Sequence, residues 1–373
     1  MTATPSGDVF NTIEYAQPSA SSDHPPRLLL IGNFLGASPG RRAVGEDLAE
    51  HLRNEGWSVL LTSRKQSRYL RVLDRLVTAW RERHRYDVAE VDVYSGSAFR
   101  WAELMCRVLR AAGKPYVLTL HGGNLPALAK RSPTRVKRLL AGAAVVTAPS
   151  RYVLDAVQDA RPDLRLIHNP IEPEAYTFRV RRRPAPRMIW VRAFHEIYNP
   201  GMAPRVLARL TDEFPASTLT MLGPDKDGSL ERTRERAASE CVLDRLTIVG
   251  GVPRSEVPTH LDVADIFLNT TNIDNSPVSV LEAMASGLCV VSTNVGGMPY
   301  LIEHERDGLL VPADDADAMA AAVRRILTEP GLAARLSRNA RAKAERFTWD
   351  VILPQWKAVL HEVARRHAVT ANA

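Results

Sequence analysis

The feature that most limits how this chain can fold is a repeated alternation of short apolar runs with amphipathic stretches. This alternation is typical of a parallel α/β sheet, in which a helix follows each strand and returns the chain to the same edge. The first half contains the expected strands Leu28–Gly32, Ser58–Leu61, Val88–Val93, Tyr116–Leu120 and Ala143–Thr147, with a helix at Arg42–Asn54. The second half contains the expected strands Met188–Val191, Thr218–Leu222, Leu246–Val249, Ile266–Asn269, Cys289–Ser292 and Leu309–Val311.

The alternation is interrupted at Thr177–Pro186, a segment with four Arg and two Pro in ten residues. Such a segment suits neither a helix nor a strand, so we interpret it as a linker between two domains. The sequence therefore predicts a doubly wound, Rossmann-like domain at 27–176, the linker at 177–186, and a second such domain at 187–345. Ligands of open parallel sheets bind at the carboxyl ends of the strands, so we expect the site in the cleft between the two sheets.

Composition narrows the class of protein further. Hydrophobic residues make up 45% and charged residues 24%, as in soluble globular proteins, and we find no apolar run long enough to span a bilayer. Residues 1–26 are polar and rich in Ser and Pro, without the pattern of a signal peptide, and we expect a disordered tail on a cytoplasmic protein. Cys106, Cys241 and Cys289 lack metal-ligand spacing, so we expect free, buried thiols.

Positive charge is concentrated at Arg64–Arg85, where eight Lys or Arg residues stand against two acidic ones in a chain of net charge +7. Apolar residues recur there at near-helical spacing over Ser67–His84. Two interpretations stay open: a surface helix packed on its sheet, or a helix that docks on anionic lipid with Arg as its polar face. The membrane patch would consist of Arg68, Arg71, Arg75 and Trp80.

The most informative segment is Asp274–Gly287, DNSPVSVLEAMASG. Ser276 is a natural N-cap and Pro277 suits the first helical position, so we expect a helix that begins here and ends at Gly287. Its free N–H groups and dipole suit a phosphate group in the cleft. Asp274 and Glu282 could bind different hydroxyls of one ligand. Taken alone, however, a turn aspartate and a solvated helix glutamate are the simpler interpretation.

These residues also resemble a family. The C-terminal half is similar to the retaining GT-B glycosyltransferases of group 1, or family 4, whose hallmark is two acidic residues separated by seven and followed by Ala-x-Ala-x-Gly. Asp274 and Glu282 match that spacing, and Ala283-Met284-Ala285-Ser286-Gly287 matches the continuation. Further agreement is found at Val249–Pro253, Ala264-Asp265, Val290–Thr293, Gly296–Pro299, Asp307–Pro312 and Phe347–Asp350.

The resemblance implies a GT-B fold, with two doubly wound domains facing across a cleft and a C-terminal helix, within 346–373, that returns to the N-terminal domain. It implies transfer of a sugar from a nucleotide diphosphate to an acceptor hydroxyl with retention, without metal or cofactor. Glu282 would bind the ribose. Asp274 would hold the sugar and diphosphate together with the backbone of Asn275, Ser276, Pro277 and Val278. The first acidic residue of the family is usually Glu, whose side chain is one methylene longer than that of Asp274.

The N-terminal half contributes two candidate segments. His121 follows the expected strand Tyr116–Leu120 on a Gly-Gly turn that lets a ligand approach the backbone. The family commonly has a His at this point, near donor sugar and acceptor, which favours a catalytic role over a structural one. The loop Gly32–Gly40 resembles the family's glycine-rich loop, so that Gly40 is a candidate for contact with phosphate or acceptor.

The family neutralises the diphosphate with an Arg and a Lys near the first strand of the second domain. Arg192 is the candidate Arg, but Tyr198 or Asn199 stands where the Lys is expected, so Lys226 is the candidate substitute. Asp225-Lys226-Asp227 also has the D-x-D pattern of metal sites in another transferase fold. We discount a metal site there because the pattern stands in a Pro/Gly turn of a two-domain chain.

The predicted acceptor is a sugar or a lipid-linked sugar, as in the synthesis of cell-surface glycans, and an anionic membrane surface is a candidate partner. Three alternatives remain open. The same fold could serve a nucleotide-sugar epimerase or a sugar phosphorylase, and the missing Lys and the Asp at position 274 leave room for an inactive scaffold. A nucleic-acid-binding protein is disfavoured, because the basic residues lie on one helix without stacking aromatics.

Overall fold

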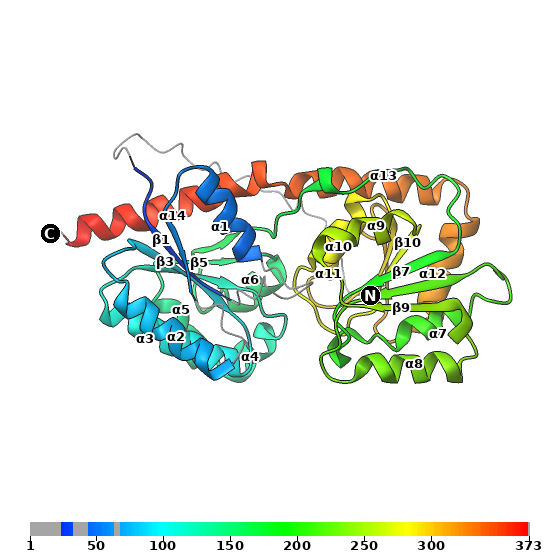
Figure 1. Ribbon diagram of the computed structural model, residues 1–373, viewed down its shortest axis with the longest axis horizontal. Helices are drawn as coiled ribbons and strands as arrows, with labels where there is room; N and C mark the ends of the chain where they lie inside the picture. Colours follow the sequence, from blue (N-terminus) through cyan, green and yellow to red (C-terminus); the bar gives the residue numbers. More distant parts are fainter. Residues whose placement is uncertain (1–23, 33–43, 63–67, 372–373) are drawn as a thin grey trace.

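The chain folds into two α/β units that lie side by side, each built on a parallel six-stranded sheet (Figure 1). A computed structural model describes residues 24–32, 44–62 and 68–371. The strand order is β2-β1-β3-β4-β5-β6 in the first sheet and β12-β11-β10-β7-β8-β9 in the second. The order reverses between β1 and β3 and between β7 and β10. The carboxyl ends of these strand pairs are therefore the places where such sheets bind ligands.

The first unit contains the N-terminal elements. Its strands are β1 (Leu28–Ile31), β2 (Val59–Leu61), β3 (Val88–Val93), β4 (Tyr116–Leu120), β5 (Val145–Ala148) and β6 (Leu164–Leu166). Its helices are α1 (Val44–Asn54), α2 (Arg68–Arg81), α3 (Ser97–Ala111), α4 (Leu125–Arg131), α5 (Pro133–Ala141) and α6 (Arg151–Val157). Helices α2 to α6 cover one face of the sheet through a core that includes Ala79, Phe99 and Leu139.

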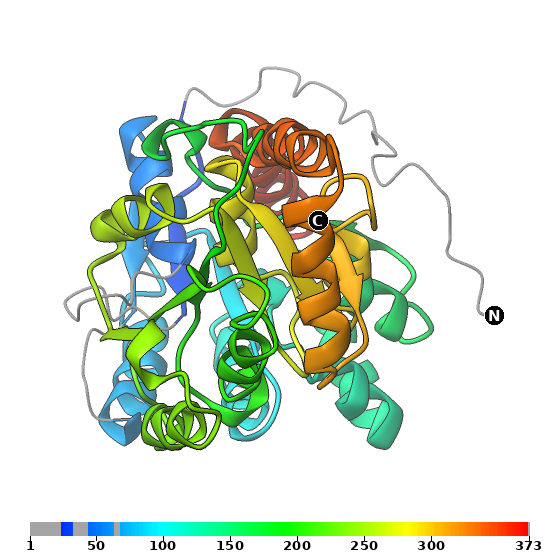
Figure 2. The same ribbon diagram turned by 90° about the vertical axis from the view of Figure 1, so that its right-hand side faces the viewer.

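The second unit has the same plan. Its strands are β7 (Arg187–Val191), β8 (Thr218–Leu222), β9 (Leu246–Gly250), β10 (Ile266–Asn269), β11 (Cys289–Thr293) and β12 (Leu309–Val311). Its helices are α7 (Met202–Ala208), α8 (Ser229–Ser239), α9 (Val257–Asp262), α10 (Val278–Ala285), α11 (Met298–Leu301), α12 (Ala316–Thr328) and α13 (Leu332–Ala344). Figure 2 shows helices on both sides of this sheet, and separate apolar cores fill its two faces.

The last helix, α14 (Trp349–Ala371), crosses back to the first unit (Figure 1). Together with α1 it covers the other face of the first sheet, where Val359, Leu360 and Val363 are buried against Leu28 and Val117. An ion pair between Arg165 Nη1 and Glu362 Oε2 (2.6 Å) ties α14 to strand β6. The predicted GT-B architecture and the returning C-terminal helix are confirmed.

Some details differ from the sequence predictions. Strand β6 was not predicted, because it is a partly buried edge strand whose centre is Arg165 rather than an apolar run. Cys106 and Cys289 are buried thiols as expected, but Cys241 is exposed on the turn after α8. Residues 177–186 contain no helix or strand in the described chain, yet they are not loosely held. Arg181 is buried there against the second unit and donates to the carbonyls of Ala264 and Ser286.

Candidate active site

The loop between β10 and α10 is where the two units meet. Asn275 Nδ2 donates to the His121 carbonyl across the cleft (3.1 Å), and its Oδ1 accepts a hydrogen bond from Ser150. Asn169 Nδ2 donates to the Ser276 carbonyl (2.9 Å). These contacts bring the carboxyl end of β4 against the loop that carries Asp274. The candidate residues of both halves therefore lie around one cleft.

Glycines of both units pack closely against the loop that carries Asp274. A Cβ at Gly297 would lie 1.7 Å from the Asn275 carbonyl oxygen, a distance that no side chain could occupy. A Cβ at Gly123 would lie 3.2 Å from a methyl carbon of Ile273. From the sequence, the Gly-Gly turn after His121 was expected to let a ligand approach the backbone. In the structure, the loop of the other unit occupies that space.

Helix α10 starts one residue later than predicted. Its first residue is Val278, and Pro277 takes the N-cap position with an extended backbone (ψ 122°), so Ser276 is not the cap. No side chain caps this helix, and the first N–H groups of an uncapped α-helix lack partners within the helix. Val278 and Ser279 line a cavity, so this positive helix end opens toward a space that a ligand could fill.

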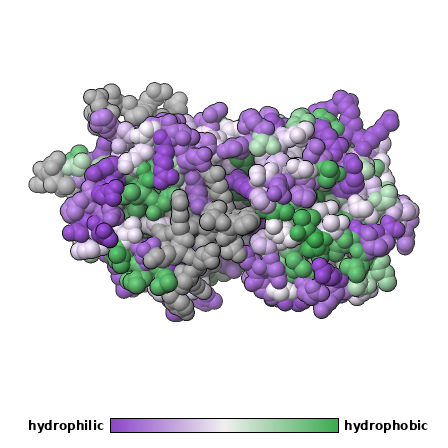
Figure 3. Space-filling model, in the orientation of Figure 1, coloured by the Kyte–Doolittle hydropathy of each residue, from purple (hydrophilic) through white to green (hydrophobic). Residues whose placement is uncertain are grey.

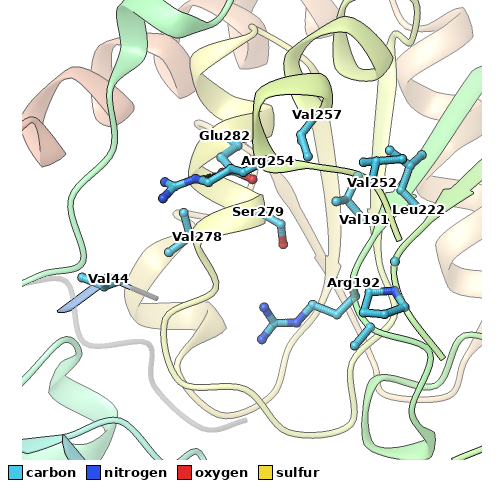
Figure 4. A pocket seen from close by; sticks show the side chains of 13 residues that line it. Val44, Val191, Arg192, Leu222, Val252, Arg254, Val257, Val278, Ser279 and Glu282 are labelled. Atoms are coloured by element: carbon cyan, nitrogen blue, oxygen red, sulfur yellow. Dashed lines mark ion pairs between the residues drawn. The ribbon is translucent and has the colours of Figure 1, made fainter. Parts of the chain in front are cut away.

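The cavity has a volume of about 270 Å³ and lies mostly within the second unit (Figure 4). Its wall is apolar at the carboxyl ends of β7 and β8 and charged at two places, marked by Glu282 and Arg192. Val44 of α1 is the contribution from the first unit. The lining residues are Val44, Val191, Arg192, Ala193, Leu222, Gly223, Pro224, Val252, Arg254, Val257, Val278, Ser279 and Glu282.

Glu282 is buried in α10 and is not the solvated residue that a bare helix pattern would suggest, since only 6% of its surface is exposed. Arg254 Nε lies 3.6 Å from Glu282 Oε1, and the same guanidinium forms an ion pair with Asp47 of α1. Although burial opposes it, the two carboxylates raise the pKa of Arg254. Tyr176 also hydrogen-bonds Glu282, and its pKa is raised by burial and by that carboxylate. Arg254 thus connects the two units at the edge of the cavity.

Arg192 marks the other charged part of the cavity. Its guanidinium pairs with Asp274 and stacks on the Tyr198 ring, 4.4 Å from the ring centre. Burial works against the charged form of Arg192, but the nearby Asp274 outweighs it and raises the pKa of the guanidinium. Tyr198, which with Asn199 is one of the two residues expected at the position of the family's Lys, thus packs on the Arg192 cation and adds no second one. Asp274 itself is 7% exposed, and its Oδ1 accepts from the Asn275 N–H (2.9 Å).

In the first unit, on the other side of the cleft from Arg192, His121 faces Asp92. Its Nε2 lies 2.9 Å from Asp92 Oδ1, and its ring stacks on Tyr94 with centroids 5.6 Å apart. Burial and the neighbouring charge of Asp92 raise the pKa of Tyr94. Tyr198 of the other unit also acts to raise it. Glu90 lies deeper in β3, where burial and Asp92 raise its pKa and Thr119 Oγ1 donates to it (2.5 Å). These polar side chains surround the carboxyl ends of β3 and β4.

One of the predicted donor-binding residues, Lys226, does not join this arrangement. Lys226 is exposed on the turn before α8 and is not among the described residues that line the cavity. Gly40 lies outside the described residues. The neighbouring aspartates bind backbone N–H groups around the start of α8: Asp225 Oδ1 accepts from the Gly228 N–H (3.1 Å), and Asp227 Oδ1 accepts from the Ser229 N–H (3.1 Å). In the part of the chain that the structure describes, no three His, Cys, Asp or Glu side chains form a group that could hold a metal ion.

The basic helix α2 differs from what the membrane interpretation required. In that interpretation Arg71 and Arg75 face solvent, but both are partly buried, and Arg75 donates to the carbonyl of Gly32 at the end of β1. The side chain of Arg68 lies outside the described part. The correction has a plain cause: the helix packs through Leu76 and Ala79, and residues 71 and 75 lie on the flank of that face, toward the strand ends.

The outer face of α2 carries an apolar stripe at positions i, i+3, i+7 and i+10. Exposed fractions are 55% for Leu70, 60% for Leu73, 53% for Val77 and 47% for Trp80. Figure 3 shows hydrophobic surface gathered at the lower left, over α2. Among the described residues, no helix combines the length and the hydropathy needed to cross a bilayer.

The structure therefore brings together His121, Asp274, Arg192, Val278 and Glu282, with Asn275 and Ser276 in the loop that joins the units. Sequence reasoning missed Asp92, Tyr94, Arg254 and Asp47. A signal was present for Asp92, since VAEVDV places two acids in an otherwise buried strand. No comparable signal marked Arg254, whose two partners are distant in sequence.

Comparison with known proteins also indicates a glycosyltransferase. Residues 182–343 match the family described as glycosyl transferases group 1, and residues 35–175 match the family described as glycosyltransferase family 4. A relative is the amylovoran biosynthesis glycosyltransferase AmsK of Erwinia amylovora, 32% identical over 52% of this chain and 49% of that protein. The alignment thus spans about half of that relative. Another is a GDP-mannose-dependent phosphatidylinositol monomannoside mannosyltransferase of Mycobacterium tuberculosis, 28% identical over 71% of this chain and 75% of that protein.

Solved structures share the fold. The sucrose-phosphate synthase of Thermosynechococcus elongatus superposes with a TM-score of 0.74 at 20% identity, over 93% of this chain and 100% of that one. The Anabaena protein HepE, solved with UDP and glucose, gives a TM-score of 0.68 at 16% identity, over 93% and 99% of the two chains. At this identity the likeness concerns the architecture alone.

Proposed function

We propose that this chain, which belongs to the group 1 glycosyltransferases of family 4, transfers a sugar from a nucleotide-diphosphate sugar to an acceptor hydroxyl with retention of anomeric configuration. One observation carries the proposal. The cavity that holds Glu282 and Arg192 opens beside an uncapped helix N-terminus, and His121 and Asp92 of the other unit line a smaller cavity that shares Val44 with it. Groups suited to the donor and to the acceptor thus lie on opposite sides of one cleft.

The donor site follows from the chemistry of the cavity. A buried carboxylate such as Glu282 accepts hydrogen bonds from two vicinal hydroxyls, which suits a ribose. The apolar wall formed by Leu222, Pro224 and Val252 suits the flat face of a base. The N-terminus of α10 and the Arg192 guanidinium supply positive potential for the diphosphate. HepE was solved with UDP and the mycobacterial relative is named for GDP-mannose, so UDP- and GDP-sugars are the first donors to test.

The reaction we propose needs no covalent intermediate. The bond between the anomeric carbon and the diphosphate oxygen breaks while the acceptor oxygen attacks from the same face, and the leaving phosphate accepts the acceptor proton. Arg192 and α10 stabilise the charge that develops on the diphosphate, and Asp274 orients both Arg192 and the sugar. Catalysis is then mostly positioning and electrostatic stabilisation, for which we assign no metal.

The proposed acceptor is a lipid-linked or polymeric sugar at a membrane surface. The outer stripe of α2 supports this, because four adjacent large apolar side chains on one helix face are unusual on a surface in contact with water only. Arg81 at the end of the helix and Arg83 just after it add positive charge, which favours anionic headgroups. The names of the Erwinia and mycobacterial relatives point to polysaccharide and glycolipid synthesis. We therefore place the enzyme at the cytoplasmic face of a membrane.

The donor is identified by thermal shift with a panel of nucleotide sugars, since a ligand that binds only the folded state raises its melting temperature. The stabilising donor is then incubated with membrane lipid extract, and release of free nucleotide diphosphate is measured. Release that requires the acceptor extract supports transfer. Release of a modified nucleotide sugar without any acceptor would instead indicate an epimerase. Absence of stabilisation by every nucleotide sugar would refute the donor site.

A further inference from the structure

The geometry points to a phosphate-binding site formed by Arg71 and Arg75 in the first unit's half of the cleft, suited to a phosphate group carried by the acceptor. This inference rests on the proposed function and names the chemistry of its acceptor. It also gives the basic helix a role that differs from the membrane patch expected from the sequence. The arginines face the cleft, and the apolar residues face outward.

The two guanidinium groups lie one helical turn apart on the same flank of α2, so their charges repel. Burial and the charge of Arg71 lower the pKa of Arg75 to about 10, although Asp92 and Tyr94 act in the opposite direction. The pair is therefore close enough to interact and is poorly hydrated. Such an arrangement is unfavourable in the absence of a compensating anion.

The described residues leave Arg71 without that anion. No carboxylate among them lies within ion-pair distance of Arg71, and its Nη1 is buried with no hydrogen-bond acceptor in the described part of the chain. Asp92, which acts on Arg75, is already 2.9 Å from His121 Nε2. A phosphate oxygen could accept from Arg71 and Arg75 together, which would satisfy the buried donor and reduce the repulsion.

The position of the pair explains why the acceptor would be the source of the phosphate. Arg75 donates to Gly32 at the end of β1 and acts electrostatically on Asp92 and Tyr94 at the end of β3. This is the switch point of the first sheet, beside His121, whereas the cavity with Glu282 and Arg192 lies mostly in the second unit. A phosphate here would hold the acceptor while its hydroxyl reaches the sugar.

The direct test measures binding of inorganic phosphate to the full chain by calorimetry, with UDP or GDP saturating the donor cavity. We expect Arg71→Gln and Arg75→Gln to weaken phosphate binding about tenfold, as expected for loss of a charge-assisted hydrogen bond. Arg81→Gln is the matched control, because this arginine is on the same helix with 81% of its side chain exposed. Unchanged phosphate affinity in both cleft variants, or an equal loss in the control, would overturn the site.

Measurements of thermal stability distinguish a phosphate-binding role of Arg71 from a purely structural one. Without phosphate, Arg71→Gln should melt at the same temperature as the wild type or higher, because it removes a buried like charge. Phosphate should raise the melting temperature of the wild type but not that of the variant. A lower melting temperature of the variant without phosphate, together with unchanged phosphate affinity, would mean that Arg71 only supports the fold. Nucleotide affinity should be unaffected, so failure of UDP and GDP to bind would count against the donor site alone.

A second pair of probes identifies where the phosphate comes from. Dodecyl phosphate and glucose 1-phosphate carry the same group, with and without a hydrocarbon chain. If the chain increases affinity and Val77→Ser removes the increase, the source is a lipid whose tail follows the outer stripe of α2. If the two probes bind equally, and both are weakened by Arg71→Gln, the source is a soluble sugar phosphate.

Discussion

His121 Nε2 lies 2.9 Å from Asp92 Oδ1, a contact between the carboxyl ends of two adjacent strands, β4 and β3. A neutral imidazole that donates from Nε2 keeps Nδ1 as its proton acceptor. Asp92 therefore fixes the orientation of the ring. Tyr94 stacks on the same ring and restricts it further. In the proposed reaction, where the leaving phosphate takes the acceptor proton, His121 would serve as a hydrogen-bonding group beside the cleft.

We expect His121→Ala to lower turnover while leaving nucleotide affinity nearly unchanged, because the nucleotide cavity is formed mostly by the other unit. Asp92→Asn should lower turnover less, about ten- to a hundredfold, by weakening the orientation of the ring. Turnover is measured with saturating donor, and nucleotide affinity by calorimetry. Asp159→Asn, an exposed carboxylate of the same unit, is the control. An equal loss of nucleotide affinity in the His121 variant would show that its assignment is wrong.

Glu282→Ala should weaken nucleotide binding about ten- to a hundredfold, which corresponds to the loss of one charge-assisted hydrogen bond of roughly 1.5–3 kcal/mol. Glu303→Ala is a suitable control, since that glutamate is exposed. Calorimetry with UDP and GDP measures the difference. If nucleotide affinity is the same in the wild type and the Glu282 variant, Glu282 does not contact the ribose.

Much of the fold could be predicted because buried parallel strands appear in the sequence as short apolar runs. Ile266–Asn269 and Leu309–Val311 are short apolar runs between turn residues, and the structure has strands at the same residues. The edge strand β6 lacks this signal, because its three residues are only partly buried. The orientation of α2 could not be predicted either. Its periodicity identifies an amphipathic helix, but only the packing of Leu76 and Ala79 decides which flank meets the cleft.

The candidate site was predictable where one segment carries several residues. Asp274 and Glu282 belong to one loop and the helix that follows it, so residues close in the sequence are also close in space. Arg254 and Asp47 are 207 residues apart and meet only because the two units close on each other. Pairs of this kind need the tertiary structure, since neither residue has a local pattern that distinguishes it from a solvated charge.

Activity is expected to survive treatment with EDTA, because the proposed charge neutralisers are the N-terminus of α10 and Arg192. The D-x-D pattern is engaged elsewhere, since Asp225 and Asp227 accept from backbone N–H groups around the start of α8. Those bonds, above all the contact with Ser229, lower the pKa of Asp227 to about 2. Transfer is measured before and after chelation. Complete loss that manganese or magnesium restores would refute this account of the leaving group.

Acid should weaken the fold through His168. Burial lowers the pKa of this imidazole to about 4, and its Nδ1 lies 2.9 Å from the Pro149 carbonyl. The unfolded chain takes up this proton near pH 6.5 and the folded chain near pH 4, so stability falls as pH decreases through this window. The upper limit of the loss is about 3 kcal/mol. Thermal unfolding of His168→Gln should depend less steeply on pH between 6.5 and 4; identical slopes would assign the acid sensitivity to other groups.

If Glu282 binds the donor as proposed, Arg254 would connect donor binding to the contact between the units, and this can be tested through Asp47. At present its guanidinium is shared between Asp47 and Glu282. When Asp47→Asn removes one carboxylate, the cation should pair more fully with Glu282 and compete with the ribose. We therefore expect nucleotide affinity to fall severalfold in Asp47→Asn, although residue 47 lies on α1, outside the second unit.

In an Arg254→Gln background the same substitution should have no effect on nucleotide affinity, because the competing cation is gone. Calorimetry on the two single variants, the double variant and the wild type measures this coupling, with Glu50→Gln on the exposed side of α1 as control. Equal losses in both backgrounds would mean that Asp47 acts independently of Arg254, and the proposed competition for Glu282 would be wrong.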